Sequence, residues 1–237
     1  MALAVTNLTS GSNTTNNPST TASINPTSGS LTLCWIGAAV AGGGTTTAMD
    51  TFVPSGARGT WTFVDDVDDS NNRRTMRLYA GTGTVTNEAV TITATCGAGT
   101  WTETMWVIDE WTGQDTSTPY DASTSNFVTN ATTVTATDVG TPGAGDAVTF
   151  GIMRDTSEAL TTNPPTGLTA LGSASGGTDV RILQSFYDST DPWTETPVFN
   201  WTTSAGGQVI GIIINAAAGG GGSKAGSVYY NLLTRSK

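Results

Sequence analysis

The feature that most constrains the fold is an alternation of threonine with apolar residues, clearest in residues 90–96, Val-Thr-Ile-Thr-Ala-Thr-Cys. Successive side chains of an extended strand point to opposite faces, so this pattern predicts a strand with one apolar face. Residues 76–80 and 148–152 repeat it. About one residue in five is threonine, which favours strands over helices. No part of the chain has the periodicity of an amphipathic helix, so we expect an all-β protein.

Three segments are apolar at consecutive positions, which is typical of central strands covered on both faces. They are Leu31–Val40, Met105–Ile108 and Val209–Ile214. Glycine-rich clusters separate these and the alternating segments, as turns between short strands would. The pattern predicts an antiparallel jelly-roll or concanavalin-like β-sandwich of roughly ten to twelve strands, extended by N- and C-terminal arms.

Composition divides the chain into three parts. Residues 1–29 are rich in Thr, Ser, Asn and Pro and predict a low-complexity arm, residues 30–218 predict the sandwich, and residues 219–237 begin with four glycines. We interpret the last part as a flexible linker with a docking segment, or alternatively as the final strand of the sandwich. The docking candidates are Val228, Tyr229, Tyr230, Leu232 and Leu233.

The net charge of −10 argues against nucleic acid and anionic membranes as partners, because both require clustered cations. The first residues lack the basic and apolar regions of a signal peptide, so we expect synthesis in the cytoplasm without a signal peptide. Residues 209–218 are too short to span a bilayer. Cys34 and Cys96 lie in apolar segments, and the sequence leaves open whether they pair or are buried free thiols.

Histidine is absent from the chain, which removes the commonest general base and the Ser-His-Asp and Cys-His mechanisms. Paired carboxylates remain, and these suffice for glycan cleavage. Glu103, Asp109 and Trp111 share one strand face, but the two carboxylates are widely spaced and Glu110 points the other way. We therefore expect no enzyme and keep a glycan hydrolase or lyase as a remote alternative.

A second acidic cluster could bind Ca²⁺, because carboxylate oxygens are the ligands that this ion prefers. It comprises Asp65, Asp66, Asp68 and Asp69. The spacing lacks the glycine and the distal glutamate of an EF-hand loop. A solvated acidic loop, partly neutralised by Arg73 and Arg74, is the alternative. We expect no other cofactor.

Aromatic residues near acidic and amide side chains in residues 111–121 and 188–193 suggest a second kind of site. Exposed Trp and Tyr rings could stack on a sugar while Asp and Asn accept its hydrogen bonds. The alternative is that these tryptophans fill the ends of the sandwich.

Several segments together resemble the jelly-roll virion surface proteins of tailed bacteriophages. They are residues 30–43, 59–62, 72–81 and 107–116, with the glycine-rich linker before Tyr229. The resemblance implies a sandwich displayed on a virus particle and transfers no catalytic residue.

These observations predict a virion structural protein, a capsid decoration, cement or head-surface protein that binds the particle through its terminal arms. The expected partner is the major capsid protein, and the expected assembly is a homotrimer or homodimer. The alternative is a tail-associated receptor-binding or carbohydrate-binding module, which a hit on a glycan array would favour.

Overall fold

The computed structural model describes residues 2–41, 49–58, 60–69, 74–83, 87–96, 100–121, 123–137, 139–177, 180–188 and 196–218. These residues form thirteen strands and no helix, and every strand pair is antiparallel. The prediction of an all-β protein is confirmed, with one strand more than the expected maximum. No helix of the described chain is long and apolar enough to cross a bilayer.

The strands form three sheets. In spatial order, the central sheet contains β1 (Ala4–Asn13), β8 (Thr100–Thr112), β3 (Leu31–Ala41), β6 (Arg74–Thr82) and β5 (Thr60–Asp68). The flanking sheet contains β11 (Thr169–Ser175), β12 (Ile182–Asp188), β10 (Ala147–Arg154), β13 (Val198–Ile214) and β9 (Thr124–Thr135). The small sheet contains β2 (Ser19–Ile24), β7 (Glu88–Cys96) and β4 (Met49–Ser55).

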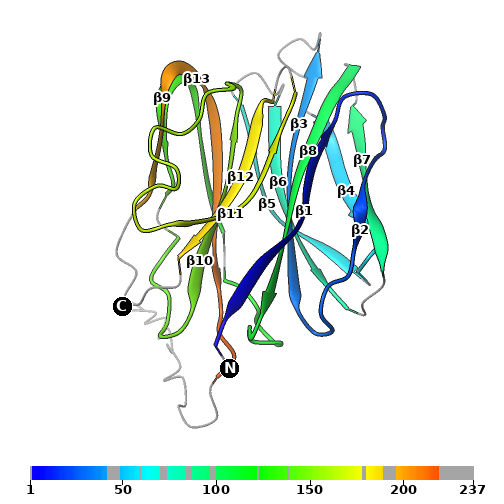
Figure 1. The fold of residues 1–237 in the computed structure, drawn as a ribbon, viewed down its shortest axis with the longest axis vertical. Coiled ribbons are helices and arrows are strands. Elements are labelled where there is room, and N and C mark those ends of the chain that lie inside the picture. Colours follow the sequence, from blue (N-terminus) through cyan, green and yellow to red (C-terminus); the bar gives the residue numbers. More distant parts are fainter. Residues whose placement is uncertain are drawn as a thin grey trace, which may run out of the picture.

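The central sheet lies between the other two (Figure 1). One face packs on the flanking sheet, and the largest apolar cluster fills this interface with Leu31, Leu33 and Trp35 from β3. The other face packs on the small sheet, where Cys34 and Ile36 meet side chains of β7. Because both faces of β3 are covered, nearly every residue of this strand had to be apolar.

The flanking sheet is also covered on both faces. Met153 and Leu183 point into the interface with the central sheet. Phe150 and Phe186 lie on the opposite, outer face, in a third apolar cluster that Leu160 and Leu168 help to form. The segment 155–168, between β10 and β11, therefore covers the outer face of this sheet.

The three segments predicted to be central strands are confirmed in the described residues. Leu31–Val40 lies in β3, Met105–Ile108 in β8 and Val209–Ile214 in β13, each with a neighbouring strand on both sides. The side chains described there are buried. The alternation in residues 90–96 also holds, because Val90, Ile92 and Ala94 point into the interface with the central sheet.

Cys34 is a free, fully buried thiol. Burial raises the pKa of this thiol well above its ordinary value, with the Asp109 carboxylate adding to the shift. The side chain of Cys96 lies outside the described residues.

The structure differs from the sequence prediction at the N-terminus. Residues predicted as an arm form β1, which pairs with β8, and β2, which pairs with β7. Leu3, Val5 and Leu8 pack against the two cores of the central sheet. Threonine and serine fit edge strands as well as they fit disordered segments, so composition alone misassigned this part. The docking segment 219–237 lies outside the described residues.

Candidate functional site

The carboxylate that seemed best placed for chemistry, Asp109 on β8, is completely buried. Its Oδ1 accepts a hydrogen bond from Asn7 Nδ2 at 3.0 Å, and its Oδ2 accepts one from Trp35 Nε1 at 3.1 Å. The Ser185 hydroxyl is a third partner. Burial raises the pKa of Asp109 to about 6, and the three hydrogen bonds oppose this rise. Asp109 is thus a structural carboxylate that joins β1, β3 and β12.

The other two carboxylates of β8 are buried in different places. Glu103 accepts a hydrogen bond from the backbone N–H of Val180, at the end of the flanking sheet. Glu110 points to the other face and accepts one from the N–H of Thr27. Glu103 and Asp109 are six residues apart on one strand, which corresponds to roughly 20 Å. A glycosidase pair is separated by about 5 to 10 Å, so these carboxylates do not form one.

The acidic segment predicted as a Ca²⁺ site runs along β5 beside β6. Asp66 forms an ion pair with Arg77 at 3.4 Å, Asp68 accepts a hydrogen bond from the Thr75 hydroxyl at 2.5 Å, and Asp69 forms an ion pair with Arg74 at 3.4 Å. Asp65 accepts a hydrogen bond from the N–H of Asp66. Each of these carboxylates has a partner from the chain, and the described residues contain no group of three or more side chains suited to a metal ion.

The tryptophans mostly fill the interior. Those described as buried are Trp35, Trp106, Trp111 and Trp201. The Trp111 ring packs edge-on against Tyr187, with centroids 5.9 Å apart. Trp111 is therefore unavailable for stacking on a sugar, whereas Tyr120 and Asp121 line a shallow hollow beside Phe63. Trp193 lies outside the described residues.

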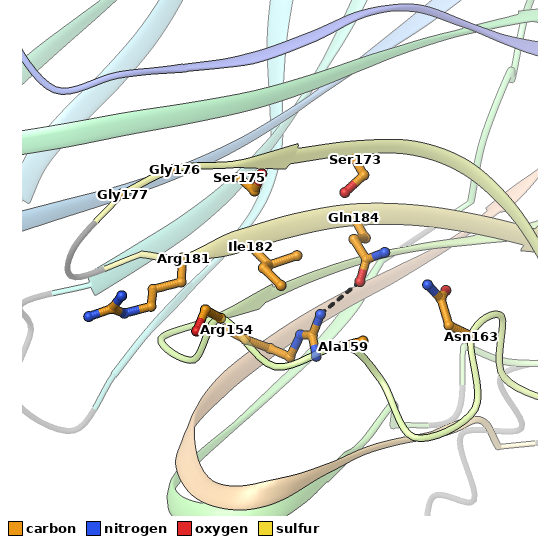
Figure 2. Close-up of a pocket in the computed structure, with 11 residues that line it drawn as sticks. Arg154, Ala159, Asn163, Ser173, Ser175, Gly176, Gly177, Arg181, Ile182 and Gln184 are labelled. Carbon is orange, nitrogen blue, oxygen red and sulfur yellow. Dashed lines mark hydrogen bonds between the residues drawn. The ribbon is translucent and has the colours of Figure 1, made fainter.

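A larger cavity than this hollow lies on the outer face of the flanking sheet and has a volume of about 450 Å³. Such a volume falls within the range of small-molecule sites. The floor is formed by β10, β11 and β12, and segment 155–168 forms the facing wall (Figure 2). The lining residues are Arg154, Ser157, Ala159, Asn163, Ser173, Ser175, Gly176, Gly177, Arg181, Ile182 and Gln184.

Arg154, the last residue of β10, is the central polar group of this cavity and is only 1% exposed. Its Nη1 donates to the Glu158 carbonyl at 2.8 Å and its Nη2 to Gln184 Oε1 at 2.9 Å. Its Nε has no hydrogen-bond partner among the residues that the structure describes. Burial lowers the pKa of Arg154 to about 10, so the guanidinium remains charged at neutral pH.

The wall segment 155–168 is fixed to β13. The Glu158 carboxylate accepts hydrogen bonds from the N–H and hydroxyl groups of Thr202 and Thr203. These bonds lower the pKa of Glu158 to about 2. Asp155 accepts a hydrogen bond from the Gly206 N–H at 2.7 Å. The wall is therefore fixed by these bonds to β13 and by the hydrogen bond from Arg154 to the Glu158 carbonyl.

Sequence reasoning did not single out this cavity. The one usable signal was Arg154 itself. It lies two residues after Ile152 and four after Phe150, so the alternation of the strand places its charge on the same apolar face. The remaining lining residues come from segments that only the strand order β11-β12-β10 brings together.

Comparisons with known proteins give no relative: no family model, curated protein or solved structure matches this chain.

Proposed function

We propose that this chain is a non-catalytic structural protein of a tailed bacteriophage particle, displayed on the capsid as a decoration or head-surface protein. The observation that carries the non-catalytic part is the burial of Glu103, Asp109 and Glu110. These carboxylates connect strands through hydrogen bonds to the chain itself. The assignment to a particle is supported by the resemblance of the sequence segments described above.

The finer fold assignment belongs to the same proposal. We interpret the three-sheet arrangement as a concanavalin-like variant of the jelly roll, with the small sheet added on the outside of a sandwich. The predicted partner remains the major capsid protein, and the predicted assembly remains a trimer or dimer.

Mass spectrometry and immunogold microscopy of purified particles test this proposal. We expect peptides of this chain in amounts comparable with a capsid component, with gold label on the particle surface. Absence from purified particles would contradict the assignment.

The contribution of the two ends differs from the sequence-based expectation. Removing residues 1–29 deletes β1 and β2 and is expected to unfold the body, so it does not test docking. Removing residues 219–237 leaves all thirteen strands and is expected to abolish particle binding at an unchanged melting temperature. Normal binding of that truncated chain would reject the docking role of Val228–Leu233.

A second candidate function, a glycan-binding module, is favoured by the cavity around Arg154. It combines polar and apolar lining groups, is open to solvent and is of ligand size. The two functions are compatible, because a displayed protein can also bind a saccharide on a cell surface.

A further inference from the structure

The charge of the cavity is opposite to that of the whole protein. Two of its lining residues are charged, and both are arginines, Arg154 and Arg181. The chain as a whole carries a net charge of −10. The two carboxylates nearest to Arg154 in the sequence have partners elsewhere: Asp155 forms an ion pair with Arg74 and accepts a hydrogen bond from Gly206 N–H. Glu158 binds Thr202 and Thr203, although its charge still acts on Arg154. A cationic hollow on an acidic protein favours an anionic ligand.

The buried guanidinium is incompletely satisfied by the chain. Arginine has five N–H donors, and the described chain gives Arg154 two acceptors, the Glu158 carbonyl and Gln184 Oε1. Its Nε–H is buried without a partner. A buried donor without a partner is costly, and a ligand oxygen that reached this N–H would remove the cost. Carboxylates and phosphates both match the guanidinium fork, so the rest of the lining has to decide between them.

The other lining groups are neutral and suited to hydroxyls. Asn163 and Gln184 supply amide groups, and Ser173 supplies a hydroxyl at the floor. Figure 2 shows the Arg154 guanidinium below Gln184, with Asn163 farther along the cavity and Arg181 pointing away on the other side. Ile182 and Ala159 offer small apolar surfaces on which a sugar ring could lie. This lining exceeds what a simple inorganic ion needs.

From these observations we propose that the cavity binds a carboxylate-bearing sugar, such as a uronic or sialic acid unit of an acidic glycan. The carboxylate interacts with Arg154, and Asn163, Gln184 and Ser173 contact the sugar hydroxyls. The exposed Arg181, whose side chain points away from the other polar lining groups, attracts the anion through its charge alone. This inference rests on the glycan-binding candidate and is independent of the assignment to a virus particle.

Calorimetric titration of the full-length chain tests the proposal with glucuronate, galacturonate and N-acetylneuraminate as probes. Glucose, galactose, acetate and inorganic phosphate are the comparison ligands. We expect at least one acidic sugar to bind at least about tenfold more tightly than the neutral sugars, because a site built for a charged group discriminates against analogues that lack it. If acetate or phosphate binds as tightly as the acidic sugars, the cavity is a simple anion site and the proposal of a saccharide ligand is wrong. No binding of any acidic sugar would overturn the site.

Four variants test the residues. Arg154→Lys keeps the charge and loses the planar fork, and is expected to weaken binding by about tenfold or more. Arg181→Ser removes an exposed cation and is expected to weaken binding by about threefold. Ser173→Trp fills the cavity from an exposed position on β11 and is expected to abolish binding in a folded protein. Arg77→Ser is the matched control, because Arg77 packs beside Asp66 and Phe63 on the central sheet.

The control should bind like the unchanged chain. If Arg181→Ser and Arg77→Ser weaken binding equally, only overall charge matters and the proposed site is wrong. If Arg154→Lys does not fold, Ser173→Trp decides: retained binding in this variant overturns the proposal. All of these measurements use the isolated chain, so a negative result leaves the particle assignment untouched.

Discussion

Asp109 and Arg154 are both buried ionisable side chains next to the flanking sheet, Asp109 at its inner face and Arg154 at its outer face. They differ in how many hydrogen-bond partners the chain gives them. Asp109 has three donors from three strands. Arg154 has two acceptors, an unpartnered Nε and a cavity beside it. A buried charge that the chain satisfies fully holds strands together, whereas one left incomplete beside a cavity is available for a ligand.

The largest expected effect concerns Asp109, whose hydrogen-bond partners all belong to the chain. Asp109→Ala removes the acceptor of the buried Trp35 Nε1–H and of the Ser185 hydroxyl, while Asn7 keeps the carbonyls of Thr9 and Ile108. We expect the free energy of unfolding to fall by about 3 kcal/mol, since each orphaned donor is costly while removal of a buried charge recovers part of the loss. Urea unfolding at pH 7 measures this. Asp66→Ala, which breaks a surface ion pair, is the control and should cost at most about 1 kcal/mol. Equal losses would contradict the structural role of Asp109.

Asp109 and the cavity-wall residue Glu158 also predict opposite dependences of stability on pH. The folded-state pKa of Asp109 is raised from 3.8 to about 6, so the folded protein holds this proton when the unfolded chain has released it. Stability from Asp109 is therefore present below pH 4 and is lost as the pH rises through 6. By linkage the loss between pH 4 and 7 is about 2 kcal/mol. This loss should appear when the free energy of unfolding of the unchanged chain is compared with that of Asp109→Asn across this pH range. A difference that does not change with pH would contradict the raised pKa of Asp109.

Glu158 shows the reverse sign, because its folded-state pKa is lowered from 4.5 to about 2. The stability that it contributes is present above pH 4.5 and is lost as the pH falls toward 2. Glu158→Gln should remove this acid-sensitive part of the profile while leaving the Asp109 part unchanged.

Loss of the anchor at Glu158 should loosen the wall of the cavity before it affects the sheets. In Glu158→Ala, we expect amide hydrogen exchange in residues 155–168 to accelerate by about tenfold, as local opening becomes easier. Exchange in β3 should stay the same. Ser157→Ala, an exposed substitution in the same segment, is the control. Unchanged exchange in Glu158→Ala would show that apolar packing alone holds this wall.

The smallest expected effect concerns the acidic strand β5. Since Asp66, Asp68 and Asp69 have partners on β6, EDTA should shift the melting temperature by less than about 1 °C, the shift expected when no bound ligand is lost. A clear decrease, reversed by Ca²⁺, would instead support the calcium hypothesis.

Local patterns predicted the strands because they depend on near neighbours in the sequence. The apolar residues on both faces of β3 and β8 could be read directly as strands covered on both sides. The fate of Asp109 could not, since its partners Asn7 and Ser185 lie about 100 and 76 positions away and come from separate sheets. β1 and β2 were missed because threonine-rich edge strands have the composition of a disordered arm.

The cavity depends still more on non-local structure. Arg154 meets Gln184 because β12 pairs with β10, and segment 155–168 closes over both after packing Leu160 and Leu168 on the sheet. A single arginine at the end of an alternating strand was the only local sign. The chemistry of the cavity became visible only when strand order and covering segment were known.

The most direct test of the contrast between the two sites follows two side-chain N–H groups in one ¹⁵N NMR titration with an acidic sugar. Trp35 Nε1–H donates to the buried Asp109 carboxylate. Arg154 Nε–H is the buried donor beside the cavity that has no partner among the described residues. We expect the Arg154 signal to shift with saturation while the Trp35 signal stays in place. An unmoved Arg154 signal when the sugar binds, or equal shifts of both, would contradict the account.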